Sequence, residues 1–171
     1  MSKHLMAALL AAGALWKGAE AKPFQLALWE PVQWRPAGDD IEGVALNLIY
    51  GRNASLTGVE AGLVNHLTGS CTGIQWGVVN RVEGNLTGIQ EAWIYSEIGG
   101  RLTGIQSAFV SRNEAMTGLQ IGLVALSEGV QGLQFGLFNQ CSSLQGLQLG
   151  LINHDRSNAK WPILPLLRWS R

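Results

Sequence analysis

Hydrophobic and polar residues recur along the chain in a unit of about 15 residues. Each unit contains a reference glycine, and these glycines fall at Gly43, Gly58, Gly73, Gly88, Gly104, Gly118, Gly132 and Gly146. Apolar side chains occupy the second position before the glycine and the first, fifth and sixth positions after it. Glutamine usually occupies the second position after it. A short fixed period of this kind predicts identical units that stack on one another.

The composition of the unit favours strands over helices. Two small residues lie four apart in each unit, threonine often precedes the first of them, and β-branched residues are abundant. We therefore predict an all-β fold, a parallel β-solenoid of about eight rungs, whose four apolar columns form a continuous core. At the ~4.8 Å spacing of paired strands, eight rungs would be roughly 35–40 Å tall. Glycine at the second small position predicts a bend or a close backbone approach.

An eight-stranded outer-membrane β-barrel, with one strand for each unit, is the alternative fold. Such barrels alternate short turns with long loops, whereas the glycine spacing here stays between 14 and 16 residues. Neighbouring barrel strands also run in opposite directions, so the same position of two units would fall at opposite membrane faces. The pattern favours the solenoid.

The first 21 residues have the three parts of a secretory signal peptide. Lys3 and His4 precede an apolar run, and Ala19 and Ala21 provide small residues for cleavage. The apolar run is shorter than the roughly 20 residues that cross a bilayer as a helix. We expect cleavage before Lys22 and export to the periplasm, the outer membrane or the cell surface.

The segments that flank the repeats differ from them in composition. All five prolines lie outside residues 37–160, because a stacked strand must donate the amide hydrogen that proline lacks. Atypical terminal segments are also needed to cover the exposed ends of a stack. The predicted organisation is a signal peptide at 1–21, an N-terminal cap at 22–42, the repeat solenoid at 43–154 and a C-terminal cap at 155–171.

The charge pattern narrows the range of partners. Without the signal peptide the chain has 10 basic and 11 acidic residues, and no lysine occurs between Lys22 and Lys160. The absence of a basic stripe argues against nucleic acid as a partner, and membrane association stays open. Two cysteines are expected to be free thiols, because Cys71 occupies an apolar column and Cys141 a linker about five units away.

One polar column could have a structural or a binding role. It consists of Gln75, Gln90, Gln106, Gln120, Gln134 and Gln148. Amides stacked in register can form a hydrogen-bonded ladder along the stack. A regular polar strip on the surface could instead bind a repeating polymer such as a glycan.

The sequence predicts no catalytic residues, no metal site and no cofactor. His66 and His154 share one position of the unit, but six rungs separate them. Asp39 and Asp40 favour a charged cap over a calcium site, since no full loop of oxygen ligands follows. A carbohydrate-active enzyme on a β-helix is a lesser alternative. It would need paired carboxylates, and Glu60 with a residue two rungs away, Glu91, is the nearest pair.

The assembled motif is Gly-Leu-Gln-x-Gly-Leu-x-Asn, as in residues 146–153. It resembles a bacterial family of exported, surface repeat-containing proteins, and the resemblance covers about residues 43–153. Asn47, Ala92 and Ala108 depart from the motif. The resemblance implies an exported or surface protein and transfers no catalytic residue. Our leading hypothesis is a non-enzymatic scaffold or binding surface of the envelope, with an envelope protein or a glycan as possible partner.

Overall fold

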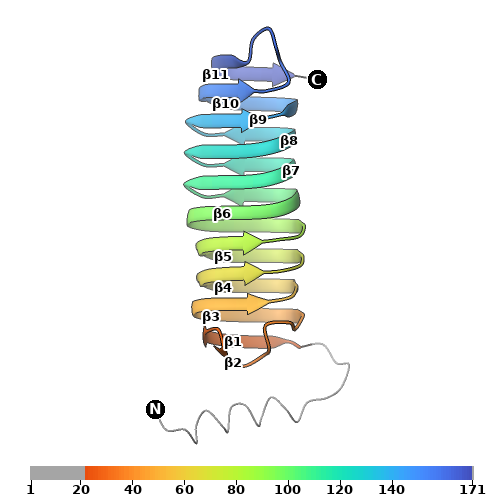
Figure 1. Cartoon of the computed structure of the whole chain (residues 1–171), viewed down its shortest axis with the longest axis vertical. Helices are drawn as coiled ribbons and strands as arrows, with labels where there is room; N and C mark the ends of the chain where they lie inside the picture. The colour runs from red at the N-terminus through yellow and green to blue at the C-terminus, as the bar shows by residue number, and fades with distance from the viewer. Residues whose placement is uncertain (1–21, 171) are drawn as a thin grey trace, which may run out of the picture.

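A computed structural model describes residues 22–170, so the predicted signal peptide at 1–21 lies outside the described residues. The chain winds into a tall stack of coils (Figure 1). The strands are β1 (Phe24–Trp29), β2 (Val32–Gln33), β3 (Ile41–Asn53), β4 (Leu56–Leu67), β5 (Cys71–Val82), β6 (Leu86–Ser107), β7 (Val110–Ile121), β8 (Val124–Phe135), β9 (Phe138–Cys141), β10 (Ser143–Asp155) and β11 (Ile163–Ser170). Within the described range the fold contains strands and no helix, and therefore no helix that could cross a membrane.

Each coil pairs with the next in parallel and in register. Gly58 of β4 pairs with Gly73 of β5, and the same position pairs from coil to coil as far as Gly146 of β10. The predicted parallel β-solenoid is thus confirmed. The alternative eight-stranded barrel is wrong, because its neighbouring strands would run antiparallel.

The ends of the stack pair differently from its middle. β1 lies parallel to β3 and turns back through the short antiparallel β2. At the other end β11 runs antiparallel to β10. These outermost strands fall within the segments at 22–42 and 155–171 that the proline distribution set apart.

A single coil has a long side, a bend and a short side. On the long side, residues from two before the reference glycine to four after it alternate between interior and exterior. The chain then bends, as at Gly122-Leu123 and Gly136-Leu137, and a short side follows. Two coils carry one extra residue at this bend, which shifts the register, so that Tyr50 pairs with Val64 and Tyr95 with Val79. These tyrosines therefore occupy the sixth position of the unit and not the seventh that simple counting predicts.

The reference glycines hold a backbone conformation that other residues avoid. All eight have φ between 133° and 148°. A Cβ atom on any reference glycine from Gly58 onward would collide with the carbonyl oxygen of the reference glycine one coil earlier. The repetition of this glycine therefore has two causes, the φ angle and the close approach of successive coils.

The predicted core of four apolar columns is wrong for three of them. Only the column two before the glycine is buried, and it comprises Ile41, Leu56, Cys71, Leu86, Leu102, Met116, Val130 and Leu144. Side chains at the first, fifth and sixth positions after the glycine lie on the outside; Ile74, for example, is 44% exposed. Strand parity accounts for the first position, because it lies three residues from the buried column, and positions an odd number of residues apart on a strand point to opposite faces. The fifth and sixth positions both point outward because they lie at the bend. The interior is completed by the glutamine column, by the seventh position and by the ninth.

Both cysteines are free and buried. Cys71 lies in the apolar interior column as predicted, whereas Cys141 occupies the interior ninth position at the end of β9 and not a linker. Burial raises the pKa of each thiol to about 12, so both stay protonated and unreactive at neutral pH.

Candidate binding surface

The glutamine column forms a ladder inside the coil. All six glutamines predicted as a possible binding strip are fully buried. Each donates from its side-chain nitrogen to the side-chain oxygen one coil earlier, over 2.5 to 3.4 Å. The hypothesis of a surface strip for a polymer is therefore wrong for these side chains. The other predicted role of these glutamines, a hydrogen-bonded ladder, is confirmed by the structure.

All amides of this ladder point the same way. In each glutamine the N–H that bonds along the ladder is directed toward the N-terminal end, so the positive ends of the dipoles face Glu60, whose Oε2 accepts from Gln75 at 2.7 Å. At the opposite end, Arg168 of β11 is the register partner of Gln148. The Glu60 carboxyl thus lies at the positive end of the ladder, which is a favourable arrangement. At the negative end, Gln148 Oε1 is buried without a hydrogen-bond partner.

Glu60 is the one acidic residue of the glutamine column. Burial raises the pKa of its carboxyl to about 7, against the opposing effect of hydrogen bonds from Gln75 and Asn47. Glu91, the other carboxylate of the pair that the lesser alternative, a carbohydrate-active enzyme, would need, lies on the exposed exterior of the coil. The two carboxyl groups therefore do not face a common substrate site.

Asparagine forms a second interior ladder at the seventh position. Asn65 donates to Asn80 at 2.8 Å and also to the backbone carbonyl of Trp76. The first coil has Gly51 at this position, and the side chain of Asn47 fills the space that Gly51 leaves. Asn47 then donates to Asn65 at 2.8 Å, which continues the ladder. The departure of Asn47 from the repeat motif is thus compensated within its own coil.

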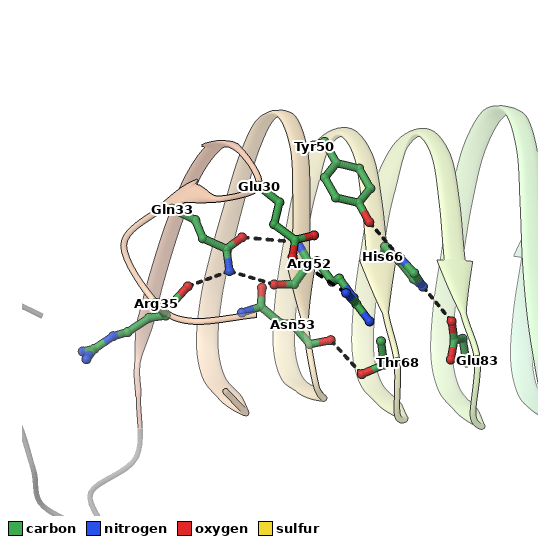
Figure 2. Close-up of polar contacts among 9 residues, drawn as sticks. All are labelled: Glu30, Gln33, Arg35, Tyr50, Arg52, Asn53, His66, Thr68 and Glu83. Carbon is green, nitrogen blue, oxygen red and sulfur yellow. Dashed lines mark hydrogen bonds and ion pairs between the residues drawn. The ribbon is translucent and has the colours of Figure 1, made fainter. Parts of the chain in front are cut away.

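A chain of polar contacts crosses three coils on the outside, near the N-terminal end (Figure 2). The Tyr50 hydroxyl lies 2.9 Å from His66 Nδ1, and His66 Nε2 lies 2.9 Å from Glu83 Oε1. The order of groups is that of a nucleophile, a base and a carboxylate. However, partial burial raises the pKa of Tyr50, which is the opposite of nucleophile activation. The hydrogen bond from His66 lowers the pKa of Glu83.

Neighbouring polar contacts fix the N-terminal hairpin to the first coils. Gln33 of β2 donates to the carbonyl oxygens of Arg35 and Arg52, and Glu30 lies 3.7 Å from the Arg52 guanidinium (Figure 2). Asp39, part of the predicted charged cap, forms a 2.6 Å ion pair with Lys22. Within residues 22–170, no group of three or more histidine, cysteine or acidic side chains could hold a metal ion.

The most extended feature of the exterior is apolar. At the bend of each coil, two consecutive side chains avoid the interior, and we call these eight pairs the apolar ridge. It comprises Leu48-Ile49, Leu63-Val64, Val78-Val79, Trp93-Ile94, Phe109-Val110, Leu123-Val124, Leu137-Phe138 and Leu151-Ile152. Tyr50 and Tyr95, each in register with a valine of the ridge, lie beside it in the two coils with an extra residue. The most exposed member of the ridge, Trp93, is 62% exposed. Exposed apolar surface this continuous is typical of an interaction site.

Two shallow apolar hollows lie beside the ridge, between it and the third position of the long side. One, of about 420 Å³, is lined in part by Leu48, Trp76 and Trp93. The other, of about 380 Å³, lies in the C-terminal half between Phe135 and Leu137. The hollows add apolar contact area next to the ridge.

The notable site is therefore this surface, and not the polar column that the sequence singled out. The apolar pairs are visible in the sequence, but their apolar character alone predicts a place in the core and not on the surface. Comparison of the chain with protein-family models, curated proteins and solved structures finds no match.

Proposed function

We propose that the chain is an exported, non-enzymatic repeat protein of the bacterial envelope or surface, a rigid scaffold that binds an apolar partner through its ridge. The predicted signal peptide supports export. The observation that best supports the binding role is the apolar ridge, which leaves large side chains such as Trp93 and Phe109 in contact with water. Water contact at so many apolar side chains is unfavourable by roughly 25 cal/mol per Å², and a bound partner would remove it.

The interior supports the scaffold role. Amide ladders and parallel backbone pairing fix every coil to the next, so the ridge is presented on a rigid support. Rigid presentation lowers the entropy cost of binding.

A fractionation experiment tests this proposal. Leu63, Leu137 and Leu151 are 51%, 52% and 59% exposed, so their replacement by glutamine should leave folding intact. We expect the wild-type chain to sediment with the envelope of the producing bacterium. The triple substitution Leu63→Gln, Leu137→Gln, Leu151→Gln, called the ridge variant, should shift it to the soluble fraction.

The long side of the coil offers a matched control. Val59, Ile74 and Ile89 lie at the first position after the glycine, away from the ridge, and are 43%, 44% and 40% exposed. Their triple replacement by glutamine, the control variant, should fractionate like the wild type. Equal behaviour of all three proteins, or a wild-type chain that is soluble and monomeric, would contradict the proposal.

A further inference from the structure

The ridge runs along one edge of the solenoid, and the opposite edge has the reverse character. The linkers at that opposite edge expose Glu83, Glu114 and Glu128. Each coil is thus apolar at its bend and polar at its linker, and in-register stacking repeats this contrast along the whole length. The cross-section resembles that of an amphipathic helix that lies in a membrane interface.

The two insertions at the bend reinforce this contrast. The coils of Gly43 and Gly88 have one additional residue there, and each contains three consecutive bulky side chains, Leu48-Ile49-Tyr50 and Trp93-Ile94-Tyr95. Ile49 is 48% exposed and Ile94 is 58% exposed. An additional isoleucine at a bend that faces water adds no favourable burial free energy. At a bend that contacts an apolar medium, the same isoleucine is transferred out of water, which is favourable.

The shape of the ridge argues against a second copy of the chain as its partner. Two convex edges in contact would meet only along a narrow band, about 7 Å wide and 38 Å long. The sides of the ridge side chains would stay in water. Contact over the long side would be larger, but it would also cover the carboxylate of Glu91. A fluid medium closes around a convex edge without this restriction.

The ridge itself contains no charged residue. The arginines on the neighbouring short side lie beside acidic residues: Arg52 is 3.7 Å from Glu30, Arg81 is 3.6 Å from Glu97, and Arg112 is the register partner of Glu97. Attraction to an anionic surface is therefore weak, and apolar insertion must supply the affinity.

We propose, as a deepening of the function above, that the partner is a lipid bilayer. The solenoid lies on its side, with its axis parallel to the membrane and the ridge inserted to the depth of the acyl chains. The polar linker edge faces the water.

Flotation with vesicles of uncharged phosphatidylcholine tests this placement. The exported chain, purified from the producing cell, should float with the vesicles at both low and high salt. Each ridge leucine that loses its lipid contact is worth about fivefold in partition coefficient, so the ridge variant should bind about a hundredfold more weakly. The control variant should bind like the wild type, and circular dichroism should show that all three proteins are folded.

The outcomes separate this inference from the proposed function. Wild-type protein that stays unbound by vesicles but forms an oligomer sensitive to the ridge variant would overturn the lipid assignment and keep the apolar binding function. Wild-type protein that is monomeric and does not float, together with a soluble location in cells, would overturn both. Binding that requires anionic lipid and disappears at high salt would overturn the insertion of the ridge.

Discussion

At the scale of single residues, the interior depends on a size match between two positions of the coil. Where the seventh position is asparagine, as at Asn65 and Asn80, the fourth is glycine in the repeats from Gly58 onward. Where the seventh position is serine, as at Ser96, the fourth is alanine, Ala92. The asparagine contributes a steric cause, because a Cβ on Gly77 would lie 2.6 Å from Asn80 Oδ1, as well as 2.7 Å from Asn65 Nδ2 and from the Gly62 carbonyl oxygen.

This match predicts a non-additive pair of substitutions. Gly77→Ala should destabilise the chain by about 2 kcal/mol through overpacking, and Asn80→Ser by about 1 kcal/mol through lost hydrogen bonds. The double variant reproduces the combination at Ala92 and Ser96, so it should be more stable than the sum of the single changes predicts, by about 1 kcal/mol. Urea denaturation of the four proteins measures this coupling. Additive effects would exclude the steric explanation.

The raised pKa of Glu60 predicts a pH-dependent stability. Because its pKa rises from 4.5 to about 7 on folding, the folded chain binds more protons than the unfolded chain between these values. The free energy of unfolding should therefore fall as pH rises through this range, by about 3 kcal/mol from this group at most.

Glu60→Gln isolates that effect. The variant extends the glutamine ladder without a charge, so it should exceed the wild type in stability at pH 8 and differ little from it at pH 4.5. Urea denaturation at both pH values provides the comparison. Glu91→Gln, on the exposed exterior, serves as the control for the change from glutamate to glutamine. A constant difference between wild type and Glu60→Gln would show that Glu60 does not titrate in this range.

At the scale of elements, the last strand closes the interior with a charged side chain. Arg168 of β11 is buried and lies 3.3 Å from the buried carboxylate of Asp155. Its guanidinium also donates to the carbonyl oxygen of Trp161. β11 is antiparallel to β10, so it ends the parallel stack and covers the edge of the last coil.

Loss of this ion pair should release the C-terminal cap. Arg168→Leu leaves Asp155 buried without its partner and should cost about 3–5 kcal/mol, with faster amide hydrogen exchange in β10 and β11 than in β5. Addition of Asp155→Asn removes the uncompensated charge and should restore part of the stability. Hydrogen exchange that rises equally in all coils would argue against a local closing role.

At the scale of the whole molecule, the usual arrangement of apolar residues inside and polar residues outside is partly inverted. Amide ladders occupy much of the interior, while leucine, valine, isoleucine and tryptophan cover one edge and part of the long side. Backbone pairing between coils and the side-chain ladders satisfy most of the polar interior, although Asn53 Nδ2 and Gln148 Oε1, for example, are buried without a hydrogen-bond partner. The fold therefore does not need all its apolar residues inside. The apolar residues that remain outside are then available to contact a partner. Both the proposed binding function and the proposed membrane placement rest on them.

The glycine period by itself determined the number of coils, their parallel register and the special glycine positions. These follow from the sequence because identical residues at a fixed interval satisfy one another only when they stack directly. The sequence also predicted the polar ladder, as one of two alternative roles for Gln75 and the equivalent glutamines.

The tertiary structure decided which columns face inward. Ile41 and Val44 are equally apolar, and only the path of the strand places the first inside and the second outside. It also decided that Asn47 replaces the side chain missing at Gly51, and that Tyr50 shifts by one position. The sequence shows how apolar each residue is. The direction of its side chain, however, depends on strand parity and on the bend in each coil.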